Sequence, residues 1–161
     1  MLISNSSTLI LLAKSTILSK FLDTVKSITI TNAVYKEILH KDSFENLIIK
    51  KETEEGRIKI ETIQEKYYLS IIKQFKIDEG EASAFALYQN KKYTGILTDD
   101  RELIKLCKIH NIKFTTAMSI VVLLFKSKII NKNTALDKLE RLQGYGRYSN
   151  EIYNYFKAMV R

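Results

Sequence analysis

The sequence has no proline, no tryptophan, one cysteine and two histidines in its 161 residues. Because Cys107 is the only cysteine, an internal disulfide and a cysteine-based zinc cluster are both excluded, which favours a reducing, intracellular setting. His40 and His110 do not have the spacing of paired metal ligands. The absence of proline, internal repeats and low-complexity segments gives no sign of a linker, so we expect one domain.

Common phosphate and nucleophile motifs are absent as well. The sequence contains no G-x-x-x-x-G-K loop, no G-x-G-x-x-G loop and no G-x-S-x-G turn. The apolar run at residues 8–13 is too short to span a bilayer, and no basic segment precedes it as a secretory signal would require. We therefore predict a cytoplasmic protein with no membrane span.

What the chain does have is an excess of positive charge. It carries 26 Lys and Arg against 18 Asp and Glu, a net charge of +8. Such a surface attracts a polyanion by counterion release, and nucleic acid is the obvious candidate. The alternative is that most of the lysines are simply solvated on helix faces.

Short apolar runs alternate with amphipathic segments along the chain. We expect strands near residues 1–4, 28–30, 57–63, 94–97 and 112–115. Most of these are followed by helices, and three further helices are expected near residues 117–126, 133–142 and 150–159. This order predicts an α/β fold with a mostly parallel sheet that is covered on both faces.

Polar side chains gather where ligands bind in such folds, beyond the carboxyl ends of the strands. Asn5 follows the first strand, Asp99 and Asp100 follow the strand that ends at residue 97, and Glu37 and Glu81 lie near helix starts. Carboxylate and amide oxygens are the ligands of a hard divalent cation such as Mg²⁺. A bound metal activates water and stabilises charge on a phosphate, so the chemistry needs no protein nucleophile.

Four segments in order resemble the PIN-domain family, which includes many small ribonucleases and the toxins of VapBC-type toxin–antitoxin pairs. They are residues 3–13 (ISNSS followed by LI and LA), 34–38 (VYKEI), 78–84 (DEGEA and A) and 97–101 (LTDDR). The resemblance implies a three-layer α/β/α domain over residues 1–125. Residues 126–161 would form a C-terminal helical extension packed on the same domain.

The resemblance also implies a function. It predicts a metal-dependent endoribonuclease that hydrolyses phosphodiester bonds in RNA with Mg²⁺ or Mn²⁺, plausibly as the toxin of a toxin–antitoxin pair. The catalytic residues carried over are Asn5, Glu37, Glu81 and Asp100, with Asp99 as a fifth candidate metal ligand. The expected partners are RNA, an antitoxin protein and a second copy of the chain.

Asn5 departs from the family pattern, in which the first position is usually Asp. An amide oxygen can bind a metal but brings no negative charge, so affinity for the cation falls. The alternative function is therefore a PIN-fold module with weakened or lost catalysis that binds RNA or protein.

Each candidate also has a structural interpretation. Glu81 lies three residues after Asp78, the spacing of a capping box. Asp99 and Asp100 have the positions of a helix cap and a first-turn acid, and Asn5 that of a cap. Glu37 precedes Lys41 by one turn and has the spacing of a surface ion pair.

The C-terminal part mixes aromatic and basic side chains from Gly144 to Phe156, a composition that suits base stacking and phosphate contact. The alternative is a terminal helix that packs Ile152, Tyr155, Phe156 and Met159 on the domain. Basic side chains that are candidates to line an RNA path are Lys91, Lys92, Lys126, Lys128, Lys132 and Arg141.

Overall fold

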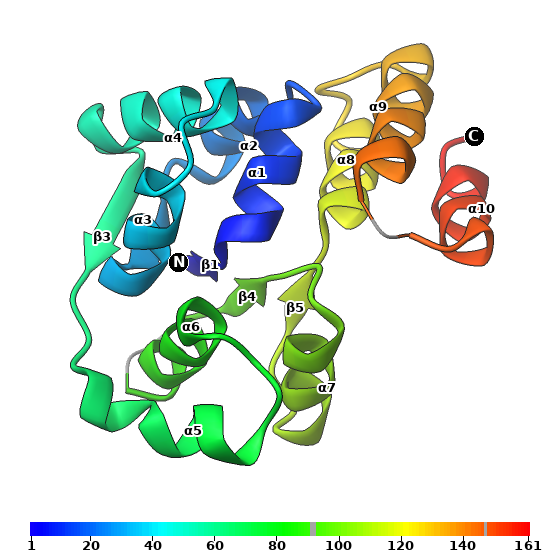
Figure 1. Cartoon of the computed structure of the whole chain (residues 1–161). Coiled ribbons are helices and arrows are strands. Elements are labelled where there is room, and N and C mark those ends of the chain that lie inside the picture. The colour runs from blue at the N-terminus through cyan, green and yellow to red at the C-terminus, as the bar shows by residue number, and fades with distance from the viewer. Residues whose placement is uncertain (91–92, 147) are drawn as a thin grey trace.

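The computed structural model describes residues 1–90, 93–146 and 148–161 (Figure 1). Within these residues, five strands form one sheet in the order β3-β2-β1-β4-β5, and every neighbouring pair is parallel. The strands are β1 (Leu2–Ser4), β2 (Ile28–Thr31), β3 (Ile58–Glu61), β4 (Gly95–Leu97) and β5 (Phe114–Thr115). The predicted α/β fold with a parallel central sheet is confirmed.

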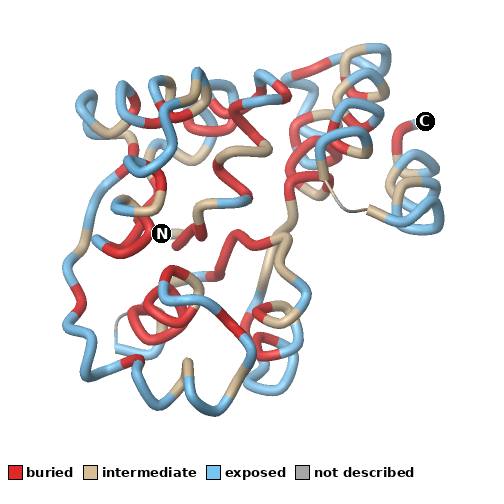
Figure 2. Tube along the Cα trace, in the orientation of Figure 1, coloured by how far each residue is buried: buried red, intermediate tan, exposed pale blue. Residues whose placement is uncertain are grey.

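Helices cover both faces of the sheet, which is why strands β2 and β4 are buried along their whole length (Figures 1 and 2). One face carries α1 (Ser6–Lys14), α2 (Leu18–Val25), α3 (Asn32–Leu39), α4 (Phe44–Glu54), α8 (Ala117–Lys126) and α9 (Lys132–Tyr145). The other carries the 3-10 helix η1 (Glu65–Tyr67) and helices α5 (Leu69–Gln74), α6 (Glu79–Asn90) and α7 (Arg101–Ile109). None of the helices described has the length and apolar sequence needed to cross a membrane.

The direction of the chain reverses between β1 and β4. From β1 the chain passes to β2 and β3 on one side, and it then returns to β4 and β5 on the other. The loops that leave β1 and β4 therefore diverge at the carboxyl edge of the sheet, which is where parallel α/β sheets bind ligands. The backbone N–H of Asn5 donates to the carbonyl of Leu97 at 3.2 Å and keeps the two strand ends together.

Helix α2 is an element that the sequence analysis did not assign. Its buried residues are Leu18, Phe21 and Leu22, which pack in the core of the larger helical layer. Their spacing of three and four residues is the ordinary signal of an amphipathic helix. Strong cap residues are missing here, since Ile17 precedes the helix and makes no side-chain capping bond.

The C-terminal helices belong to the same core as the sheet. Ile120 to Leu124 on α8 is buried except for Leu123, which is 45% exposed, so this apolar run is mainly core. Buried residues of α9 join that cluster, and α10 (Asn150–Ala158) packs beside α8 and α9. The division of the chain near residue 125 stays a prediction.

The packing predicted for the last helix is wrong in two residues. Ile152 and Tyr155 are exposed, whereas Tyr153, Phe156 and Met159 pack against the core. The helix is rotated relative to the expectation because its apolar residues form a broad stripe, and sequence spacing alone does not fix which part of the stripe faces inward.

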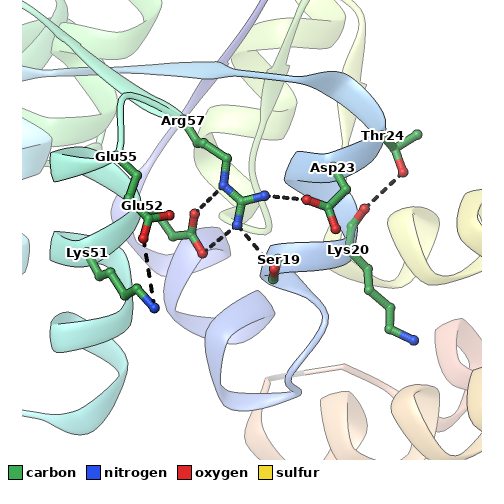
Figure 3. A network of polar contacts seen from close by, with 8 residues as sticks. All are labelled: Ser19, Lys20, Asp23, Thr24, Lys51, Glu52, Glu55 and Arg57. Carbon is green, nitrogen blue, oxygen red and sulfur yellow. Dashed lines mark hydrogen bonds and ion pairs between the residues drawn. The ribbon is translucent and has the colours of Figure 1, made fainter.

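One charged network ties helices α2 and α4 to Arg57, the residue that precedes β3 (Figure 3). The Arg57 guanidinium donates to both carboxylate oxygens of Glu52, at 2.6 and 2.8 Å, and also to Asp23 and Ser19 of α2. Glu52 on α4 is only 5% exposed. The hydrogen bonds with Glu52 raise the pKa of Arg57 above its ordinary value, so the guanidinium stays charged.

The end of α4 brings these two residues together. Gly56 has φ of +77°, the left-handed conformation that favours glycine. Its N–H donates to the Thr53 carbonyl, and the N–H of Arg57 donates to the Glu52 carbonyl. The turn at Gly56 that follows α4 thus also places Arg57 beside the buried carboxylate.

We predict that Arg57→Met lowers the free energy of unfolding by about 3 kcal/mol, because it leaves the buried Glu52 carboxylate unpaired. Asp23→Asn is the matched control, since the Asp23 side chain is 66% exposed and its loss costs less than about 1 kcal/mol. Urea unfolding measures both values. Equal losses for the two variants contradict the assignment of Glu52 as the partner that matters.

Candidate functional site

The predicted site residues lie at the carboxyl edge of the sheet. Asn5 directly follows β1, and Asp99 and Asp100 follow β4 by two and three residues. Glu37 projects from α3, and Glu81 lies in the first turn of α6. Asn5 is buried, whereas the four acids are partly exposed.

The side chain of Asn5 links the two diverging loops. Its Oδ1 accepts a hydrogen bond from the Thr8 N–H at 3.1 Å and so caps α1, as one interpretation of the sequence expected. Its Nδ2 donates to Thr98 Oγ1 at 3.0 Å, and the same hydroxyl oxygen accepts from the Asp100 N–H at 3.1 Å. Thr98 therefore joins Asn5 to Asp100, a role that the sequence analysis did not anticipate.

Glu37 is held by two neutral donors. Ser6 Oγ donates to its Oε2 at 2.8 Å, and the Gly80 N–H donates to its Oε1 at 3.1 Å. No ion pair with Lys41 forms in the part of the chain that the structure describes. Burial raises the pKa of Glu37 above its ordinary value, and the hydrogen bond from Ser6 opposes this shift.

Gly80 is a site residue that the sequence analysis missed. A Cβ atom at this position would lie 2.5 Å from Glu37 Oε1, far inside contact distance. Only glycine lets the start of α6 approach the carboxylate closely enough for its N–H to donate.

Glu81 forms the predicted capping box with Asp78. The Glu81 N–H donates to Asp78 Oδ1 at 2.8 Å, and Glu81 Oε2 accepts from the Asp78 N–H at 3.0 Å. The pKa of Glu81 is raised to about 8, mainly by burial and in addition by the negative charges of Asp78, Asp100 and Glu37. The capping bond is therefore compatible with a site role, because the same side chain lies in the field of three other acids.

The adjacent acids Asp99 and Asp100 have different surroundings. Asp99 accepts hydrogen bonds from Thr8 Oγ1 at 2.8 Å, from the Ala117 N–H and from the Tyr148 hydroxyl. Burial nevertheless raises its pKa, against the effect of these donors. Asp100 caps α7, because its Oδ1 accepts from the Leu103 N–H at 2.7 Å. Its second carboxylate oxygen, Oδ2, accepts from no other described residue.

Within the described residues, no basic side chain neutralises the acids of this edge. The chain has 26 Lys and Arg. None of those among the described residues forms an ion pair with Glu37, Glu81, Asp99 or Asp100. Such a concentration of unpaired carboxylates fits the oxygen donor set of a hard divalent cation. Among residues 1–90, 93–146 and 148–161, however, no group of three His, Cys, Asp or Glu is already close enough to hold one ion. The predicted ligand set stays a prediction.

Only some of the basic and aromatic residues proposed to contact RNA can be located. Lys91, Lys92 and Arg147 lie outside the described residues. The other four candidates are exposed: Lys126 on α8, Lys128 in the loop that follows it, and Lys132 and Arg141 on α9. Arg141 forms an ion pair with Asp137 at 3.1 Å. Tyr148 reaches the site directly through its hydrogen bond to Asp99.

A parallel sheet with an acidic edge at its switch point defines a class of small α/β proteins with a nuclease-type fold. A family model described as DUF3368, a PIN domain, matches residues 1–160. The chain belongs to the PIN-domain family, which confirms the resemblance in the sequence. The match continues through α9 and α10. A comparison with curated proteins finds no match.

The raised pKa of Glu81 predicts how stability depends on pH in the absence of metal. The folded protein keeps the Glu81 proton up to about pH 8, whereas the unfolded chain releases it near the ordinary value of 4.5. The contribution of Glu81 to stability is therefore full below pH 4.5 and is lost as the pH rises towards 8. In EDTA we expect the Tm of the wild type to fall relative to that of Glu81→Gln over this range.

Glu102→Gln is the control for this measurement, because Glu102 is a surface residue of α7 that pairs with Lys105. It should keep the pH dependence of the wild type. Parallel curves of Tm against pH for the wild type and Glu81→Gln would show that Glu81 is not the titrating group.

Proposed function

We propose that this chain is a metal-dependent endoribonuclease. The observation that carries the proposal is the gathering of Glu37, Asp78 and Asp100 around Glu81, a partly buried carboxyl that no basic residue pairs with in the described chain. Burial first, and these negative charges second, raise the pKa of Glu81. Glu37, Glu81 and Asp100 would hold Mg²⁺ or Mn²⁺. Asn5 and Asp99, the other predicted members of the set, would support them by fixing the loops after β1 and β4.

A divalent cation at this edge would supply an activated water and would stabilise negative charge on the phosphate. The residues of the chain hold the carboxylates in position and provide the electrostatic field of the site. Ser6 and Gly80 hold the Glu37 carboxylate, and Asp78 holds that of Glu81. Helices α1, α6 and α7 begin at this edge, and their positive N-terminal ends favour an anionic substrate. The net charge of +8 steers RNA towards the protein.

We predict that the purified protein cleaves single-stranded RNA in the presence of Mn²⁺ or Mg²⁺ and that EDTA abolishes the cleavage. Glu81→Gln and Asp100→Asn should each eliminate activity but keep the fold, since Gln and Asn still accept the capping hydrogen bonds. Glu102→Gln is the control and should cleave like the wild type. Robust cleavage by both site variants rules the proposal out.

A second prediction concerns Gly80. In Gly80→Ala the new methyl group displaces the Glu37 carboxylate, which lies at the end of a flexible side chain and can move. We expect kcat/KM for RNA cleavage to fall about a hundredfold, the cost of a misplaced catalytic group. Stability should not fall, because alanine favours the helix by up to about 1 kcal/mol.

Gly144→Ala is the matched control, since a Cβ at Gly144 meets no atom within 4 Å. It should leave cleavage unchanged. Wild-type activity in Gly80→Ala would mean that the position of Glu37 does not matter for the reaction.

A second candidate function is a PIN-fold module that binds RNA without cleaving it. It is favoured by Asn5, which is 2% exposed and uses both ends of its amide in hydrogen bonds within the protein. The cleavage assay distinguishes the two candidates, because a binding module retains RNA but leaves it intact with every divalent cation tested.

The finer biological role rests on the family resemblance alone. We propose that the protein acts in the cytoplasm as the toxin of a toxin–antitoxin pair, forms a homodimer and is held inactive by an antitoxin chain. A small gene for a DNA-binding antitoxin next to this one would support that role.

A further inference from the structure

A cavity of about 370 Å³ lies beside the acidic edge. Its polar side is formed by Asp99, Asp100 and Arg101, at the point where β4 leads into α7. Its apolar walls come from Leu11 of α1, Ile104 of α7 and three residues of the C-terminal segment. These three are Tyr148, Ile152 and Phe156.

The hydrogen bond from Tyr148 to Asp99 gives this wall a fixed place. Burial raises the pKa of the Tyr148 hydroxyl, so the group donates as a neutral phenol over the physiological pH range. The ring fits because Gly146 has no Cβ, which would collide with the Tyr148 ring. The C-terminal segment is therefore anchored at a site residue, and two of its aromatic side chains, Tyr148 and Phe156, line the cavity next to the acids.

We infer that this cavity binds one unpaired nucleobase of the RNA next to the phosphate that is cleaved, an inference that rests on the proposed endoribonuclease function. The volume lies within the range of small-molecule sites, about 300–1,000 Å³. Aromatic and aliphatic walls suit the flat face of a base, on which proteins commonly stack Tyr and Phe. A phosphate is disfavoured in the same space, because two carboxylates border it.

Arg101 is the residue that would select the base. It is exposed, lines the cavity and has no partner carboxylate within the described parts of the chain. A guanidinium presents paired donors, which match the two adjacent acceptors O6 and N7 of guanine better than the edge of any other base. The geometry therefore points to a preference for guanine beside the cleavage position.

The test uses a pool of random-sequence RNA whose cleavage positions are mapped by sequencing of the fragment ends. We expect the wild type to prefer guanine next to the cut. Ile152→Trp fills the cavity and should abolish the preference, and Arg101→Ala should lower kcat/KM for guanine sites on the order of tenfold to a hundredfold. Ile152 is 41% exposed, so the larger side chain can be accommodated without unfolding.

Tyr155→Trp is the matched control, because Tyr155 lies on the same helix, is 63% exposed and does not line the cavity. It should keep the preference of the wild type. Cleavage without any base preference, or a preference that survives in Ile152→Trp and Arg101→Ala, overturns the inference and leaves the nuclease function intact.

A second measurement does not depend on cleavage. Guanosine carries no phosphate, so its binding reports on the base site alone. In NMR titrations it should shift signals of residues around Tyr148 in the wild type and in Tyr155→Trp, but not in Ile152→Trp. Failure of the wild type to cut any RNA would refute the nuclease proposal, whereas absence of guanosine binding to the wild type would refute the base site.

Discussion

Neutral hydrogen-bond donors hold the acids at the carboxyl edge of the sheet, and the arrangement of the site depends on these donors being uncharged. Ser6 and the Gly80 N–H bind Glu37, and the Asp78 N–H binds Glu81. Such donors fix the position of a carboxylate without cancelling its charge. The edge therefore keeps its negative potential, which contributes together with burial to the raised pKa of Glu81 and suits an external cation.

A buried acid elsewhere in the chain is paired with a basic side chain. Glu52 is more deeply buried than the site acids, and Arg57 neutralises it with two hydrogen bonds from one guanidinium. Burial by itself thus does not explain unpaired carboxylates in this protein. The absence of a basic partner for the edge acids among the described residues supports the proposed cation site, because such a partner would compete with a metal ion.

Much of the fold and part of the site could be predicted from the sequence, because the signals are local. The alternation of short apolar runs with helices predicted the layers of the fold, and the spacing of Asp78 and Glu81 predicted the capping box. Gly80 and Tyr148 were beyond such reasoning. Their partners are Glu37, 43 residues away, and Asp99, 49 residues away, and those pairs meet only through the tertiary fold.

Asn5 shows how a structural and a functional requirement can act on one position. Its amide offers an acceptor to the Thr8 N–H and a donor to the Thr98 hydroxyl, and an ionised Asp could provide only acceptors. An Asp here would also add a fourth negative charge to the three that already raise the pKa of Glu81. The amide therefore links the two loops and reduces the charge that a cation must balance. In the proposed nuclease Asn5 would thus belong to a site with fewer negative charges, and its amide alone is no argument against the proposed cation.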